Sequence, residues 1–156
     1  MTAAWRDGAV VVLDFSDSGA RLERMLRRVG CDGAAGPVPG WVADPLAAYF
    51  GGDLDGLAAV PTAARGTPFQ TRVWDALRTL RPGERLSYGA MGARLGLPPS
   101  AARAVGSANG ANPISLVIPC HRLVGGRGAL TSYAGGLHRK AWLLDHEAAG
   151  RREAVV

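Results

Sequence analysis

A thiol, an imidazole and a guanidinium follow one another at Cys120, His121 and Arg122. A thiol attacks a carbon atom only as the thiolate, and at its ordinary pKa little of it is ionised at neutral pH. Neighbouring basic groups lower the pKa of a thiol, and a histidine can take its proton when a carboxylate orients the imidazole. The segment therefore indicates a nucleophilic cysteine. A pair of this kind is also compatible with a buried, unreactive thiol beside an unrelated histidine.

The residues before this cysteine must position it. Residues 114–118 read Ile-Ser-Leu-Val-Ile, an apolar and β-branched run that predicts a buried strand. Pro119 has no backbone N–H to give to a sheet, so we expect the strand to end there and to present Cys120 at its end. We expect Arg122 to hold this turn in place through an ion pair.

The composition is that of a globular protein. The chain has 156 residues, of which 47% are hydrophobic and 20% are charged, enough for one ordinary domain or two small ones. No apolar run approaches the length of a membrane helix, and the first residues lack the features of a signal peptide, so we expect a cytoplasmic protein, or a nuclear one if the source has a nucleus. The two cysteines, Cys31 and Cys120, lack the spacing of zinc ligands. We expect no metal, no other cofactor and no role for Cys31.

The charge points to a polyanionic partner. The formal net charge is +5, and all but one of the 18 basic residues are arginines, Lys140 being the exception. Arginine binds phosphates with two N–H groups and enters DNA grooves in ways that lysine does not. The same bias could reflect the nucleotide composition of a genome, and both explanations stay open.

The first third of the chain has the pattern of a small α/β module. Residues 9–15 predict a strand, and residues 22–29 predict a helix. A loop is expected at residues 31–37. Asp44-Pro45 predicts the start of a short helix that ends at Phe50. The Gly-, Ala- and Pro-rich residues 51–66 predict a linker.

Three short helices should follow the linker. Thr67, Pro68 and Gln70 form a helix start with a capping box, and Ser87 caps a second helix that ends at Gly96. A tight turn leads into a third helix from Ser100 to Ala108. Two short helices joined in this way are typical of a helix-turn-helix.

The third of these helices carries small side chains around one arginine, Arg103. Helices that read the major groove usually carry several long polar side chains. Small residues instead permit the close approach that the minor groove demands, with one long group to insert. A helix packed closely in the core, with Arg103 in solvent, would have the same composition. A final helix is expected from Leu137 to Glu147, with Trp142, Leu143 and Leu144 in the core and a frayed tail after it.

Several blocks together resemble one family. They are Gly66-Thr67-Pro68-Phe69-Gln70, Val73-Trp74, Ser87-Tyr88-Gly89, Arg103-Ala104-Val105-Gly106, Asn112-Pro113, Pro119-Cys120-His121-Arg122 and Tyr133-Ala134-Gly135-Gly136-Leu137 with Lys140. In this order and spacing they resemble the O6-alkylguanine-DNA alkyltransferases, also called methylated-DNA–protein-cysteine methyltransferases. The similarity covers residues 66–147. The N-terminal third matches only loosely.

The resemblance implies a fold and a division of the chain. The fold class is α/β, of the α+β kind: a ribonuclease-H-like N-terminal module at residues 1–62 and a helical domain with a winged-helix-like helix-turn-helix at residues 66–148. Residues 149–156 would be a tail. The partner would be double-stranded DNA, bound through the minor groove by a monomer.

The resemblance also implies a reaction. The alkyl group of O6-alkylguanine, and less efficiently of O4-alkylthymine, would move irreversibly to Cys120 after the base is flipped out of the duplex. Each molecule would act once. His121 and Glu147 would relay the proton of the thiol through a water, Tyr88 would assist the leaving base, and Asn112 would support the reactive turn.

The remaining implied residues contact DNA or the flipped base. Those at the DNA are Ser100, Ala102, Arg103, Ala104 and Gly106, with Arg103 filling the gap left by the base. Those at the base are Tyr88, Tyr133, Ala134 and Leu123, with backbone groups of Cys120 and Leu123 holding the exocyclic amine. Ala134 stands where some members have a serine, and Ser132 stands where glycine is usual.

Two other functions compete with this reading. A non-catalytic helix-turn-helix protein that binds lesions or regulates genes would use DNA without Cys120. A thiol hydrolase or redox enzyme would turn over at Cys120 and ignore DNA. The helix around Arg103 argues against the second, and the Cys-His-Glu set argues against the first.

Overall fold

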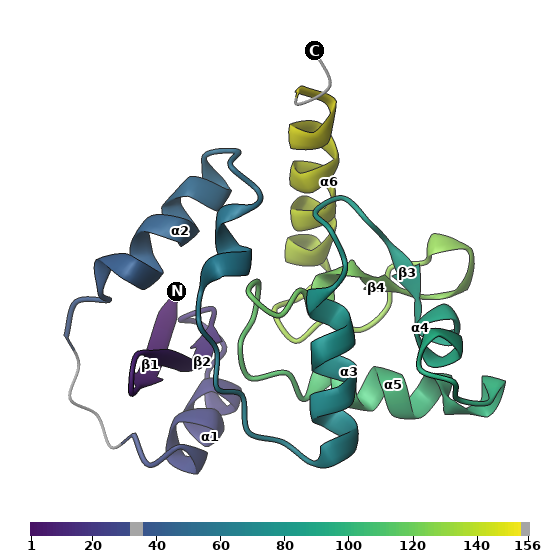
Figure 1. The fold of residues 1–156 in the computed structure, drawn as a ribbon, viewed down its shortest axis with the longest axis horizontal. Coiled ribbons are helices and arrows are strands. Elements are labelled where there is room, and N and C mark those ends of the chain that lie inside the picture. The colour runs from purple at the N-terminus through teal and green to yellow at the C-terminus, as the bar shows by residue number, and fades with distance from the viewer. Residues whose placement is uncertain (32–35, 154–156) are drawn as a thin grey trace. The chain divides into compact units, whose positions relative to one another are not determined.

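The structure is a computed structural model that describes residues 1–31 and 36–153 (Figure 1). Its contacts divide the chain into two units: residues 1–65 with Pro113–Val117, and residues 66–112 with the chain from Ile118 onwards. Each unit combines helices with one small sheet, so the predicted α+β class is confirmed. Part of the predicted loop at residues 31–37 and the last residues of the predicted tail lie outside the described residues.

The first unit contains a β-hairpin, of which the sequence predicted only the second strand. β1 (Thr2–Arg6) pairs antiparallel with β2 (Ala9–Asp14). The two residues between them, Asp7 and Gly8, have φ values of 52° and 74°. A two-residue Asp-Gly turn with positive φ matches the right-handed twist of paired strands, which explains the tight hairpin.

Two helices accompany the hairpin. α1 (Ala20–Arg28) buries Leu22 and Met25 as its spacing predicted. α2 (Gly40–Phe50) begins earlier than expected. Its first turn closes before Asp44 because the backbone N–H groups of residues 42 and 43 both donate to the carbonyl of Pro39. The predicted start at Asp44-Pro45 is therefore wrong, and Pro45 lies inside the helix.

Two later segments pair with β2 and complete this unit. Within the predicted linker, Val60 is buried, and Ala63 donates its N–H to the carbonyl of Val10. Ile114 forms a parallel bridge with Leu13. Sheet pairing ends there, so the strand predicted for residues 114–118 is wrong although every residue in it is buried.

The reason is a turn centred on Leu116. Its φ of 71° lies in the left-handed region. The N–H of Val117 donates to the carbonyl of Ser115 over 2.9 Å, which closes a three-residue γ-turn. The chain therefore reverses locally before it reaches the cysteine, instead of running on as a strand.

The second unit contains the predicted helix-turn-helix. α3 (Pro68–Arg78) has the capping box between Thr67 and Gln70. α4 (Tyr88–Arg94) is capped by the hydroxyl of Ser87. A 3₁₀ turn at Pro99–Ala101 leads into α5 (Ala102–Gly110), which packs on α4 and α3. β3 (Leu86–Ser87) pairs in parallel with β4 (Leu123–Val124), the two residues directly after the reactive turn.

α6 (Leu137–Glu153) is longer than predicted, so the frayed tail does not begin at residue 148. Its buried positions are Lys140, Leu143, Leu144 and Glu147, the spacing of one helical face. Trp142 lies off that face and is 51% exposed, so its prediction as a core residue is wrong. Its ring stacks on that of His146, with the centroids 4.8 Å apart.

No helix in the described part of the chain has the length and apolar character needed to cross a membrane.

Candidate active site

Cys120 opens a single 3₁₀ turn that two asparagine side chains hold. The turn spans Cys120–Arg122, and the cysteine is 5% exposed. Asn112 Nδ2 donates to the carbonyl of Ile118 over 2.8 Å, and Asn109 Nδ2 donates to the carbonyl of Cys120 over 3.1 Å. The peptide units on both sides of Pro119-Cys120 are therefore anchored to the end of α5 and to the residues directly after it.

The histidine of this turn meets the carboxylate expected from α6. His121 Nε2 lies 2.9 Å from Glu147 Oε1, and both side chains are fully buried. Arg122 adds a forked ion pair to the same carboxylate, with Nη2 2.8 Å from Oε1 and Nε 3.0 Å from Oε2. The backbone N–H of Gly83 donates to Oε2 over 2.9 Å. The ion pair predicted for Arg122 is confirmed.

These contacts define the charge of each group. Burial alone would raise the pKa of Glu147, but the hydrogen bonds from His121 and Arg122 outweigh it and hold that pKa far below its usual range. Burial lowers the pKa of His121, against the attraction of Glu147, and the positive charges of Arg122 and Lys140 lower it further. At neutral pH the site therefore holds a carboxylate beside a neutral imidazole.

A carboxylate can only accept hydrogen bonds, so Nε2 of His121 must carry the ring proton. Nδ1 is then the basic nitrogen of the ring. It is buried and has no hydrogen-bond partner among the described residues. The arrangement provides a buried proton acceptor on the residue that follows Cys120.

A second cluster surrounds Tyr88 at the start of α4. Lys140 Nζ lies 3.5 Å from the Tyr88 hydroxyl, 5.7 Å from the centre of its ring and 2.8 Å from the carbonyl of Thr131. Burial raises the pKa of Tyr88; a hydrogen bond with the Thr131 side chain opposes this, and negative charge on Cys120 adds to it. The phenol is therefore protonated at neutral pH and can donate its proton.

Lys140 connects this cluster to the nucleophile. Burial lowers its pKa, and a thiolate at Cys120 works against that loss. The interaction is mutual, so an ammonium at Lys140 favours the thiolate. Lys140 was not predicted to have a role, although it is the one lysine of a chain rich in arginine. Asn109 was missed as well, because its neighbours only indicated a turn.

The helix expected at DNA lies against this same cluster. Arg103 is exposed near the start of α5. Farther along, a Cβ at Gly106 would lie 3.7 Å from the ring of Tyr88. A methyl group there would make only an ordinary contact, so α5 passes close to the tyrosine but does not require glycine at this position. Ser100 and Ala104 are exposed, and Ala102 is half-buried, at the same end of the helix.

The remaining predicted residues follow the reactive turn in sequence. Leu123 is buried in β4 and pairs with Leu86. Tyr133 is half-buried and Ala134 is exposed in the segment before α6. Among the described residues, no cluster of His, Cys, Asp and Glu side chains could hold a metal ion.

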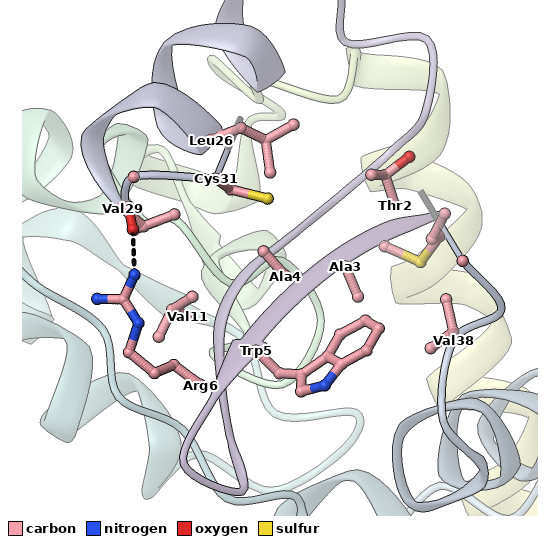
Figure 2. Close-up of a pocket in the computed structure, with 13 residues that line it drawn as sticks. Thr2, Ala3, Ala4, Trp5, Arg6, Val11, Leu26, Val29, Cys31 and Val38 are labelled. Atoms are coloured by element: carbon pink, nitrogen blue, oxygen red, sulfur yellow. Dashed lines mark hydrogen bonds between the residues drawn. The ribbon is translucent and has the colours of Figure 1, made fainter. Parts of the chain in front are cut away.

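A separate pocket of about 610 Å³ lies in the first unit, between β1 and the end of α1 (Figure 2). It is lined by side chains that include Trp5, Arg6, Leu26 and Cys31. None of the predicted site residues is among those that line it. Among the described residues that line it there is no histidine, so none of them offers Cys31 a proton acceptor comparable with His121.

Comparisons with known proteins find relatives along most of the chain. A family profile described as "6-O-methylguanine DNA methyltransferase, DNA binding domain" matches residues 68–149. The methylated-DNA–protein-cysteine methyltransferase of Salmonella typhimurium is 51% identical over 131 residues, which cover 81% of this chain and 76% of that protein. The crystal structure of Mycobacterium tuberculosis OGT in complex with DNA superposes with a TM-score of 0.77 at 40% identity, covering 95% of this chain and 86% of that one. The O6-methylguanine-DNA methyltransferase from Pyrococcus kodakaraensis gives a TM-score of 0.72 at 27% identity, covering 91% and 88%.

Proposed function

The chain belongs to the methylated-DNA–protein-cysteine methyltransferase family, and we propose that it repairs O6-alkylguanine in duplex DNA by moving the alkyl group to its own Cys120. The single observation that carries this proposal is the buried His121–Glu147 pair, because its hydrogen bond leaves Nδ1 of the imidazole as a buried base on the residue next to Cys120. A protein that only bound DNA would have no need of such a base.

The first step forms the thiolate. The proton of the Cys120 thiol passes, through a water as in the family, to Nδ1 of His121. The imidazolium so formed is stabilised by the carboxylate of Glu147, which already accepts the Nε2 hydrogen bond. The ammonium of Lys140 favours the negative sulfur. Arg122 holds Glu147 ionised, so its part in the reaction is indirect.

The second step transfers the alkyl group. The thiolate attacks the alkyl carbon in line, the S–C bond forms, and the bond between that carbon and O6 breaks with its electron pair leaving on the purine. The hydroxyl of Tyr88 donates its proton to a ring nitrogen and neutralises the departing base. The phenolate that remains faces Lys140 Nζ, 3.5 Å from the oxygen. Every proton and electron pair is thereby assigned.

The lesion reaches this pocket by base flipping. Arg103 on α5 would enter the minor groove and fill the gap left by the rotated guanine. Ser100, Ala102, Ala104 and Gly106 would let the helix approach the DNA closely. Binding would be largely independent of sequence and weakened by salt, because contacts to phosphates dominate.

The flipped base would lie between Tyr88 and the segment before α6. Tyr133 would line the pocket, and the backbone N–H of Ala134 would serve at O6, since alanine has no hydroxyl. The backbone groups of Cys120 and Leu123 would hold the exocyclic amine of guanine. Asn112 supports the turn through its bond to the carbonyl of Ile118. O4-alkylthymine would fit the same pocket less well.

A thioether is stable, and no group in this set is placed to hydrolyse it. Each monomer should therefore react once. The test mixes the protein with a molar excess of duplex containing one O6-methylguanine and measures how much lesion disappears. We expect repair to stop when one lesion has been repaired for each protein molecule. Continued turnover would contradict the proposal.

A non-catalytic lesion-binding protein is the competing function. It would bind the modified duplex tightly, repair nothing, and behave identically after Cys120→Ser. We expect the Cys120→Ser variant to bind the duplex and to lose repair completely.

A further inference from the structure

A buried carboxylate holds the segment that leads into the reactive turn. Asp14 is the last residue of β2, and its side chain is 1% exposed. Its Oδ1 accepts a hydrogen bond from the hydroxyl of Ser115 over 3.0 Å, and its Oδ2 accepts one from Nε of Arg21 over 2.9 Å. The backbone N–H of Phe15 also donates to Oδ1, over 2.9 Å. The steps proposed above for alkyl transfer use none of these groups.

Ser115 is also held through its backbone. Its N–H donates to the carbonyl of Leu13 over 2.7 Å, and the N–H of Leu13 donates to the carbonyl of Pro113 over 2.9 Å. The residue is 4% exposed, so these hydrogen bonds are shielded from water. The bond from its hydroxyl to Asp14 adds a side-chain contact to the backbone pairing and fixes the orientation of Ser115.

The residue after Ser115 has a backbone conformation that needs such support. Leu116 has a φ of 71°, in the left-handed region that residues with a side chain disfavour. Strained conformations of this kind persist only where the surrounding structure holds them in place, and they are common at functional sites. The γ-turn at Leu116 is closed by the carbonyl of Ser115, so the anchored residue is the first residue of the strained turn.

Two consecutive turns connect Ser115 to the nucleophile. The γ-turn at Leu116 is the first. In the second, the N–H of Cys120 donates to the carbonyl of Ile118 over 2.8 Å. Pro119 lies between them, and its φ and ψ of −81° and 64° are those of an inverse γ-turn. Every residue from Ser115 to Cys120 therefore belongs to a closed turn, and a change in the first turn is passed along the backbone to the cysteine.

We propose that Asp14 and Ser115 are positioning residues for Cys120: their buried hydrogen bond keeps the turn at Leu116 in its strained form and so holds the sulfur where it can attack the alkyl carbon. The inference rests on the proposed function, in which Cys120 is the alkyl acceptor. Without this hydrogen bond, Leu116 should relax out of the left-handed region, and conformers with a displaced Cys120 should outnumber the reactive one. Even a small misplacement of the reacting atoms slows an in-line attack strongly.

The test separates the rate of transfer from the binding of DNA. Single-turnover transfer to Cys120 is measured at saturating concentrations of a duplex with one O6-methylguanine. The dissociation constant is measured with the unmodified duplex. We expect Ser115→Ala to lower the saturating rate about tenfold, the population factor for holding one residue in the left-handed region. The dissociation constant should be unchanged, because no group on α5 is altered.

Asp14→Asn changes the other end of the same hydrogen bond. An amide keeps only one acceptor oxygen for the donors that face the carboxylate, so this variant should also slow transfer. If both residues act through one contact, the double variant should be no slower than the slower single variant. Two independent structural defects would instead multiply their losses of rate.

A matched control weakens the first unit at another place. Met25 on α1 packs in a core cluster with Val12 and Leu22. Met25→Ala should lower the melting temperature at least as much as Ser115→Ala does, because it leaves a cavity. The transfer rate of the folded control should equal that of the wild-type protein.

A wild-type transfer rate in Ser115→Ala, multiplied losses in the double variant, or an equal loss of rate in Met25→Ala would overturn the inference. If only one of the two single variants folds, its rate decides alone. Failure of both to fold would also overturn the inference, since the contact would then be a requirement of folding. Failure of the proposed function looks different, because the wild-type protein itself would then transfer no methyl group.

Discussion

Replacing Glu147 by glutamine should remove more stability than any surface change on α6. The carboxylate accepts hydrogen bonds from His121, Gly83 and the guanidinium of Arg122. A glutamine keeps one acceptor oxygen and turns an NH₂ group toward the donors. Arg122, only 6% exposed, would then be a buried charge without its counter-ion. Removal of one partner from such a pair costs about 3–5 kcal/mol.

The stability lost in Glu147→Gln should depend on pH and should shrink in acid. The pKa of Glu147 is far lower in the folded protein than in the unfolded chain. The stability that the ionised Glu147 adds is therefore complete above the pKa of this group in the unfolded chain, about 4.3, and is lost as the pH falls below that value. The loss is about 1.4 kcal/mol for each pH unit until the folded pKa is reached. The wild-type protein and Glu147→Gln should accordingly converge in acid.

The assay is urea unfolding at pH 7.5 and again at several values below pH 4.5. Asp145 on the same helix provides the control, because its ion pair with Arg85 spans 3.5 Å and its side chain is 81% exposed. Asp145→Asn should change the free energy of unfolding by less than about 1 kcal/mol. A loss below about 1 kcal/mol for Glu147→Gln, or a difference that persists unchanged into acid, would refute the reasoning.

Three further substitutions test other parts of the account. Gly66→Ala places a Cβ 2.5 Å from the ring of Trp74 and should lower the free energy of unfolding by about 1–3 kcal/mol, measured by thermal unfolding. The control Gly110→Ala, whose Cβ would have nothing within 4 Å, should cost nothing. Equal effects of the two changes would contradict the close contact between Gly66 and Trp74. Tyr88→Phe should slow transfer from the duplex about 10²-fold by removing the acid while DNA affinity in a gel-shift assay is unchanged; a wild-type rate would exclude Tyr88 as the proton donor. Arg103→Ala should slow transfer from duplex DNA but not from a free O6-alkylguanine base, and should leave the melting temperature unchanged because the side chain is exposed; equal slowing on both substrates would argue against a role at DNA.

Local signals predicted the second unit well. Thr67 with Gln70 and Ser87 with its following turn are capping patterns whose hydrogen bonds form within four residues. The residues that determine where each of these helices starts therefore lie at the start of the helix itself. Resemblance to the family supplied the distant partner of His121, since no spacing rule links it to a glutamate on α6.

Each error has a physical cause that the hydrophobic pattern does not report. Residues 114–118 look like a strand because they are buried, but a γ-turn at Leu116 ends their pairing after one bridge. β1 was missed because its hairpin depends on the conformation of Asp7-Gly8 more than on its own alternation. Trp142 was assigned to the core by residue type, although the face defined by Lys140 and Glu147 excludes it. Hydrophobicity alone could not assign that face, since two of its members are charged.

The most direct test of the central claim is the mass of the intact protein and of its cysteine peptides after incubation with one equivalent of duplex carrying O6-methylguanine. We predict a gain of one methylene unit on the peptide with Cys120, none on the peptide with Cys31, and none in Cys120→Ser. Tight binding of the duplex without any gain in mass, or a gain on Cys31, would contradict the assignment of Cys120 as the alkyl acceptor.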